Sequence, residues 1–267
     1  MGPGASGYLT HHFGFRTPIL GAAALSFLSI MGTTFLLPRE PRPEQASPTE
    51  ATGAPPAPGG RRVRVLDWGS YVVYFKRPVL GALLFEFFLF TLAFAMFTSG
   101  AALFAERRFS WHGAPFGPKE VGAIFMYSGF VGMLVQGALR QGALLRLVGE
   151  IGLVRGGFVL AALGYALLGY SHYLTLLLVA MSLTALGTGV LRPALTSLVT
   201  QRVERNEQGV VLGLTQSLMS VSQIAGPALA GALIDRRLLE LWALIAAALM
   251  LVGVASSSRA MRARGVP

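Results

Sequence analysis

The sequence predicts an all-α, polytopic membrane protein with seven full transmembrane helices. Of its 267 residues, 53% are hydrophobic and only 13% are charged, whereas soluble domains carry about 25% charged residues. The mean hydropathy is +0.59. The apolar residues also gather in long runs, as crossing a bilayer core of about 30 Å requires. Together these observations exclude a soluble globular core.

Seven apolar runs are long enough to cross a membrane. Residues 1–9 precede them and are apolar but too short, so we expect them to be the end of a further span that begins upstream. The seven runs are 17–37, 78–104, 120–144, 151–170, 173–199, 209–234 and 238–257.

A segment rich in Pro, Gly and charge separates the first run from the other six. Residues 38–76 include PREPRPEQASPTE and APPAPGG, a composition that cannot bury enough apolar surface to fold a core. We predict a flexible cytoplasmic linker between a first unit, 1–37, and a six-helix bundle, 77–258. A short amphipathic segment is expected near the end of the linker, where Trp68 and Tyr71 suit the membrane interface. Residues 259–267 form a basic tail.

The distribution of Lys and Arg predicts the orientation. Fifteen of the 22 Lys and Arg residues fall in the linker and on the same side of the predicted spans, and six fall on the other side. Cytoplasmic loops carry such an excess, so the linker and the C-terminus are predicted to be cytoplasmic in a cell membrane. The net charge of +10 is therefore assigned to this bias, and no nucleic-acid partner is expected.

Signals of enzymatic chemistry are missing from the sequence. There is no cysteine, no phosphate-binding glycine loop and no nucleophile elbow. The four histidines, His11, His12, His112 and His172, have no metal-ligand spacing and are interpreted as solvated loop residues. We expect no enzyme activity and no cofactor.

One short motif occurs twice, near the two ends of the chain. The pattern Gly-Pro-x-x-x-Gly precedes a closing apolar run both before the linker and at the end of the six-run unit, as in transporters built from two parallel halves. The two copies are Gly2, Pro3 and Gly7, and Gly226, Pro227 and Gly231.

Several segments resemble the major facilitator superfamily, and most closely its drug:proton antiporter branch of the tetracycline-efflux type. Residues 206–235, NEQGVVLGLTQSLMSVSQIAGPALAGALID, are similar to the eleventh span of that branch. Residues 185–198 resemble its tenth span, residues 7–18 its turn from fifth to sixth span, and residues 141–150 its loop between the eighth and ninth. On this resemblance the first four and a half spans are expected to lie upstream of Met1.

The resemblance implies roles for two groups of residues. Gly213 and both Gly-Pro-x-x-x-Gly copies are expected to act as conformational hinges. The loop at Gly142, Arg146, Gly149 and Glu150 corresponds to a cytoplasmic latch motif, although it lacks the Asp-Arg pair of that motif. The expected partners are the lipid bilayer, a small-molecule substrate and protons.

Two charged residues fall inside predicted spans. Glu86 lies about 12 Å below the cytoplasmic edge, counted at 1.5 Å per residue, among apolar neighbours that favour its protonated form. It is a candidate for proton or substrate coupling, or else a neutral residue hydrogen-bonded between helices. Arg192 is a candidate cavity charge and partner for Glu86, or else a side chain that reaches the cytoplasmic headgroups.

Polar residues also occur at helical spacing within the spans. Gln216, Ser220 and Gln223 follow i, i+4, i+7 and share one face of a helix. Side chains of this kind line a cavity or bond across helices. Gln136 is a similar candidate in the third full span.

Two functions are consistent with these patterns. The first is a secondary active transporter that exports a small amphipathic molecule by proton-coupled alternating access. The second is a half-carrier that is inactive alone, self-associates or pairs with another membrane module.

Overall fold

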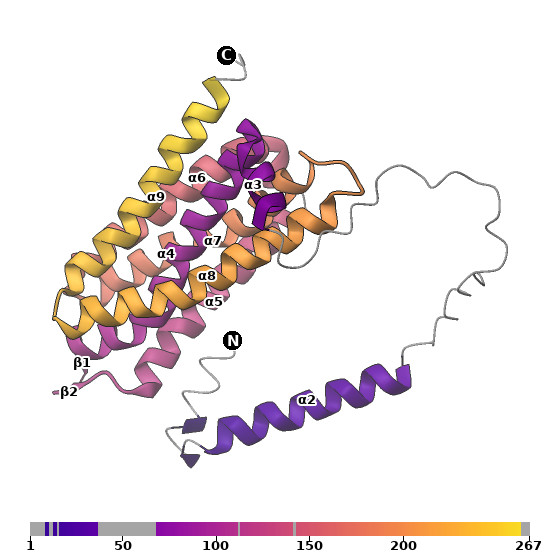
Figure 1. The fold of residues 1–267 in the computed structure, drawn as a ribbon. Coiled ribbons are helices and arrows are strands. Elements are labelled where there is room, and N and C mark those ends of the chain that lie inside the picture. Colours follow the sequence, from indigo (N-terminus) through magenta and orange to yellow (C-terminus); the bar gives the residue numbers. More distant parts are fainter. Residues whose placement is uncertain are drawn as a thin grey trace, which may run out of the picture.

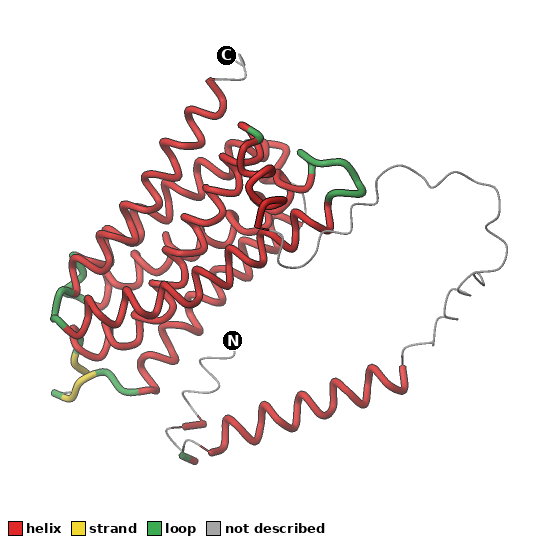
Figure 2. The backbone as a smooth tube through the Cα atoms, viewed as in Figure 1, coloured by secondary structure: helices red, strands yellow, loops and turns green. Residues whose placement is uncertain are grey.

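The computed structural model describes residues 9–10, 13–14, 16–36, 68–111, 113–140 and 143–262. These ranges contain seven helices long and apolar enough to cross a membrane, which confirms the all-α, polytopic prediction (Figures 1 and 2). The helices are α2 (Arg16–Leu36), α3 (Trp68–Lys76), α4 (Pro78–Arg108), α5 (Pro118–Arg140), α6 (Ala143–Gly169), α7 (Leu174–Thr200), α8 (Gln208–Asp235) and α9 (Leu239–Arg262).

Helices α4 to α9 form a bundle in which short connections join successive helices. A two-stranded antiparallel hairpin, β1 (Ser110–Trp111) and β2 (Ala114–Pro115), connects α4 to α5. We call this end of the bundle, with the turns at 170–173 and 236–238, the hairpin end. The opposite end carries α3 and the turn at 201–207 and is called the linker end (Figure 1).

The six helices differ greatly in burial. Helix α4 is central and packs against α7, α8 and α9, while α6 lies between α7 and α9. In the most apolar 18-residue stretch of each helix, the buried share is 67% in α4, against 17% in α5 and 22% in α8. Helices α5 and α8 therefore leave wide faces uncovered by the bundle.

Aromatic side chains close the centre of the bundle near the hairpin end. Trp242 of α9 is 1% exposed, and its indole Nε1–H donates to the Met96 carbonyl of α4 at 3.2 Å. Its ring lies 5.4 Å from that of Phe104. Gly100 allows this approach, because a Cβ there would lie 2.7 Å from the indole. These contacts fix α9 against α4.

Within the described ranges, no other helix buries α2. Its large apolar side chains are exposed, with Phe35 reaching 79%, and it lies apart from the bundle in Figure 1. Thr33 and Thr34 hydrogen-bond to carbonyls of their own helix, which leaves an apolar surface all round. A helix of this kind requires lipid or other helices around it.

Helix bounds differ from the predicted runs mainly at charged ends. Helix α4 continues past residue 104 to Arg108 because its terminal arginines find carbonyl acceptors: Arg107 donates to Ile234 O and Arg108 to Ser171 O. Helix α5 ends at Arg140 rather than 144. The last nine residues of the predicted linker form α3, and α9 runs to Arg262, inside the predicted basic tail.

Candidate functional site

An exposed polar surface within a span lies on α8. Gln216, Ser220 and Gln223 are all exposed, on the face that turns away from α4, and we call them the α8 polar row. Ser220 Oγ donates to the Gln216 carbonyl at 3.0 Å. Neither glutamine amide hydrogen-bonds to another described residue, so both keep their donors and acceptors available. At membrane depth such groups need a partner.

A neighbouring face of α8 is held tightly against α4. The hydroxyl oxygens of Thr91 and Ser222 are 2.9 Å apart, and both residues are buried. One turn further on, a Cβ at Gly226 would lie 2.6 Å from Ala95 Cβ, so the two backbones approach closely. This contact fixes the rotation of α8 and therefore the direction of the polar row.

The predicted hinge residues of α8 fall into two groups. Gly226 is buried in the α4 contact, whereas Pro227, Gly213 and Gly231 are exposed. Pro227 lacks the N–H that would donate to the Gln223 carbonyl, which weakens the helix beside the polar row. A Cβ at Gly213 or Gly231 would meet nothing within 4 Å. Their hinge role stays a prediction, and Gly2, Pro3 and Gly7 lie outside the described residues.

Glu86 and Arg192 are placed in different environments. Glu86 is 1% exposed, on the packed side of α4. Arg192 is exposed on α7, and its Nη2 lies 3.7 Å from Met219 Sδ of α8. The arginine is therefore close to the open face of α8. A coupling role for Glu86, and its pairing with Arg192, stay predictions.

Helix α5 contributes further polar groups. Gln136 is exposed, and its side chain hydrogen-bonds to no other described residue. Tyr127, 39% exposed, places its hydroxyl 2.7 Å from Ser182 Oγ of α7. The tyrosine thus attaches α5 to α7, and Gln136 stays a candidate only.

The predicted loop motif forms a junction between α6 and α7. Gly149 has φ 70° and ψ 165°, a conformation that only glycine adopts without strain, and the chain bends there. Glu150 Oε1 then accepts hydrogen bonds from Ser197 Oγ at 3.0 Å and Gln201 Nε2 at 2.9 Å. Sequence reasoning missed both partners. Arg146 is exposed, and Gly142 lies outside the described residues.

An ion pair at the linker end was also missed. Arg77, just before α4, donates from both terminal nitrogens to Glu207, just before α8, at 2.9 and 2.8 Å. Its guanidinium also lies 5.0 Å from the Tyr74 ring centroid of α3. The hydrogen bonds from Arg77 lower the pKa of Glu207 below its ordinary value. This pair, named the Arg77–Glu207 clamp, joins the starts of α4 and α8.

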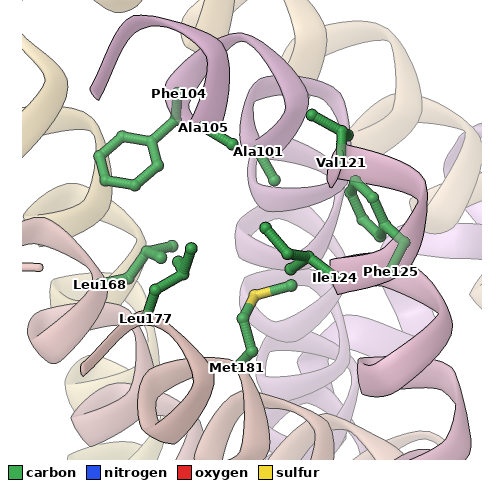
Figure 3. Close-up of a pocket in the computed structure, with 9 residues that line it drawn as sticks. All are labelled: Ala101, Phe104, Ala105, Val121, Ile124, Phe125, Leu168, Leu177 and Met181. Carbon is green, nitrogen blue, oxygen red and sulfur yellow. The ribbon is translucent and has the colours of Figure 1, made fainter. Parts of the chain in front are cut away.

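A small pocket near the hairpin end has entirely apolar walls (Figure 3). Without a polar lining group, it has nothing to orient a hydrogen-bonding substrate. The pocket is therefore a weaker candidate than the α8 polar row. Its lining residues are Ala101, Phe104 and Ala105 of α4, Val121, Ile124 and Phe125 of α5, Leu168 of α6, and Leu177 and Met181 of α7.

Metal-ligating side chains do not cluster in the described ranges. No group of three or more His, Asp or Glu residues within them could hold a metal ion. The site is thus a set of uncharged hydrogen-bonding side chains on an open helix face, with one arginine beside it.

The sequence of the chain matches a protein-family profile and several individual proteins. The profile of the Major Facilitator Superfamily matches residues 1–227 and 142–258. The chain is 28% identical over 242 residues to "Multidrug resistance protein 2" of Bacillus subtilis (strain 168), covering 88% of this chain and 54% of that protein. It is 27% identical to "Tetracycline resistance protein, class C" of Escherichia coli, covering 85% and 52%. The chain thus spans about half the length of these relatives.

Proposed function

The chain belongs to the Major Facilitator Superfamily, and we propose that it serves proton-coupled export of a small amphipathic molecule by alternating access. The seven apolar helices in the described ranges make it a multi-pass membrane protein. The names of its relatives refer to multidrug and tetracycline resistance, which supports an amphipathic drug-like substrate. Because the chain spans about half of those proteins, we propose this role for the chain together with the rest of the transporter.

The open face of α8 is the observation that carries the proposal. The α8 polar row presents two amides that hydrogen-bond to no other described residue, and exposed Val221 and Ile224 lie beside it, with Ile224 reaching 77%. A surface that combines amide groups with aliphatic side chains complements a molecule that is itself part polar and part apolar. We propose that this face lines the substrate path.

Proton coupling is assigned to Glu86. A carboxyl group that is 1% exposed within a span is costly to ionise, and such groups mark proton or ion pathways. Arg192, exposed near α8, is proposed to attract the substrate or the ionised carboxylate during the cycle. The hinge residues of α8 are proposed to permit the change of access.

The orientation is proposed from charge alone. The excess of Lys and Arg in the linker and in the loops on its side of the spans favours a cytoplasmic linker end and a cytoplasmic C-terminus in the cell membrane. The hairpin end then faces outside.

Transport in reconstituted vesicles tests the proposal. Proteoliposomes that contain the chain together with the rest of the transporter are loaded with tetracycline, and efflux is followed after a pH step across the membrane. We expect efflux that depends on the pH step and is abolished by a protonophore. Glu86→Gln should remove the dependence on pH, whereas Glu106→Gln, an exposed carboxyl on the same helix, should not. An efflux rate that is the same with and without the pH gradient would contradict proton coupling.

The uncovered faces of α5 and α8 favour a second candidate. Phe130, Met133 and Leu134 of α5 are 45 to 57% exposed, an apolar surface that suits packing against a partner helix as well as contact with lipid tails. The chain would then be a half-carrier that is inactive alone and pairs with a second copy or another membrane module. Light scattering in detergent distinguishes the two: a protein mass near 28.3 kDa excludes self-association, and twice that mass supports it.

A further inference from the structure

A polar cluster joins three segments at the hairpin end. Arg108, at the end of α4, donates from Nε to the Ser171 carbonyl at 3.2 Å. Its Nη2 lies 2.6 Å from His172 Nε2 and 3.2 Å from Glu240 Oε1. Ser171 is completely buried. One guanidinium group therefore ties α4 both to the turn between α6 and α7 and to the start of α9.

The hydrogen bonds of His172 define its tautomer. Its Nδ1 lies 2.8 Å from the Tyr170 carbonyl oxygen, which can only accept, so the proton of the neutral imidazole is on Nδ1. Nε2 then carries the lone pair and accepts from Arg108 Nη2, which can only donate. The contact with Arg108 thus exists only while the imidazole is neutral.

We infer that His172 is a proton-binding site that controls one of the two hydrogen bonds between the α6–α7 turn and Arg108 of α4. A proton taken from water binds Nε2, the atom that accepts from Arg108. The new N–H faces a guanidinium N–H, so the hydrogen bond is lost and two cations stand side by side. Imidazoles as a class change protonation between about pH 5 and 8, which sets the pH range of the test below.

The charged groups around His172 decide what happens after protonation. Arg108 faces it from α4 and Glu240 faces the same guanidinium from α9. Arg107, the neighbouring cation on α4, is directed to the Ile234 carbonyl instead. Arg108 therefore keeps Glu240 and the Ser171 carbonyl as partners when it loses His172, and only one of its two bonds to the α6–α7 turn depends on the proton. Tyr170 and Tyr173, the other titratable residues of the turn, are exposed.

This inference goes beyond the proposed transport function and does not depend on it. The α8 polar row and Glu86 take no part in the cluster, and the test uses neither substrate nor vesicles. A negative result in the test of one proposal therefore does not contradict the other proposal.

The test compares melting temperatures of the purified chain in detergent at pH 7.5 and pH 5.0. His172→Gln is the main variant, because its amide oxygen can accept from Arg108 and does not titrate. We expect the wild type to lose about 2–4 °C more than this variant on acidification, the shift expected for one hydrogen bond in a chain of this size. His112→Gln, which removes a histidine elsewhere, should behave like the wild type. Equal acid sensitivity of His172→Gln and wild type would overturn the inference.

Hydrogen–deuterium exchange of the wild type gives a second measurement that needs no variant. Exchange is normalised to an unstructured peptide at each pH, and the peptide that contains residues 170–174 is compared with one from the centre of α6. We expect protection at 170–174 to fall at least threefold between pH 7.5 and 5.0, with the α6 peptide unchanged. Unchanged protection at 170–174, or an equal fall in both peptides, overturns the inference.

Discussion

The two faces of α8 contain similar small and polar residues but have opposite surroundings. On one face, Ser222 and Gly226 are buried against α4. On the other, Gln216, Ser220 and Gln223 are exposed, and neither amide hydrogen-bonds to another residue in the part of the chain that the structure describes. Helical spacing puts each set on its own side, while packing against α4 determines which side faces inward. A polar residue in a span can therefore serve either packing or recognition, and only its neighbours distinguish the two.

Replacing Gly226 should have the largest effect. In Gly226→Leu the new Cβ would lie 2.6 Å from Ala95 Cβ and 2.9 Å from the backbone N of Met96, so α8 must move off α4. We expect the free energy of unfolding to fall by about 3 kcal/mol, measured by thermal or denaturant unfolding in detergent. Gly231→Leu is the matched control, since nothing lies within 4 Å of its Cβ position. Similar losses in both variants would show that the packed face is not special.

Changes on the open face should affect transport rather than stability. Gln216→Ala combined with Gln223→Ala removes two hydrogen-bonding amides at about 1 kcal/mol each. We expect substrate efflux in vesicles to fall about tenfold or more, with the melting temperature unchanged. Ser217→Ala provides the control, because this exposed serine bonds to the Gly213 carbonyl of its own helix. A large drop in melting temperature with the double change would assign the polar row to folding.

The hydrogen bond between Thr91 and Ser222 should contribute a smaller amount. A double-mutant cycle with Thr91→Val and Ser222→Ala should give a coupling of about 0.6 kcal/mol, the average for hydrogen bonds between membrane helices. Thr98→Val paired with Ser222→Ala should give none, because Thr98 bonds only to carbonyls of α4. The cycle is read from unfolding free energies in detergent. Zero coupling between Thr91 and Ser222 would leave Gly226 as the main determinant of the α4 contact.

The Arg77–Glu207 clamp should have the smallest effect, and it holds the start of α8 rather than either face. Because the pKa of Glu207 is lowered in the folded chain, the pair stabilises the fold above the ordinary carboxyl pKa of 4.5. That contribution is lost as pH falls below 4.5 through the folded pKa. Its exposed side chains limit the contribution to under about 1 kcal/mol. Melting curves should show Glu207→Gln less stable than wild type at pH 7, with the difference shrinking toward pH 4.

If the difference between Glu207→Gln and wild type instead grows on acidification, the ion pair does not stabilise the folded chain. Glu204→Gln at the same end is a suitable control, since Glu204 is exposed and forms no ion pair among the described residues.

Local patterns were sufficient for the fold class and for the polar row. Long apolar runs predicted the spans because burial in lipid requires about 20 residues whatever the partner helix. The spacing of Gln216, Ser220 and Gln223 predicted one shared face, since that follows from helix geometry alone. The predicted bounds are wrong where a helix ends in charged residues. The apolar run predicts an end at residue 104, yet Arg107 and Arg108 continue the helix and donate to carbonyls of distant segments.

Contacts between distant segments could not be predicted from one sequence. Arg77 and Glu207 are 130 residues apart, and Thr91 and Ser222 are 131 apart. Neither pair has a local signal, because each residue alone fits a solvated or back-bonded side chain. His172 was interpreted as a solvated loop residue for the same reason, although it is bonded to Arg108. The functional roles of Glu86, Arg192 and the hinge residues stay predictions.

The buried environment of the Trp242 indole affects its fluorescence. The indole is buried and hydrogen-bonded to Met96, whereas Trp111 is 51% exposed. Under 295 nm excitation, Trp242 should emit at shorter wavelength than Trp111 and be shielded from a water-soluble quencher such as iodide. If α9 lifts from α4, the emission of Trp242 should shift to the red and become quenchable. The chain therefore carries its own fluorescent reporter of whether these two helices stay together.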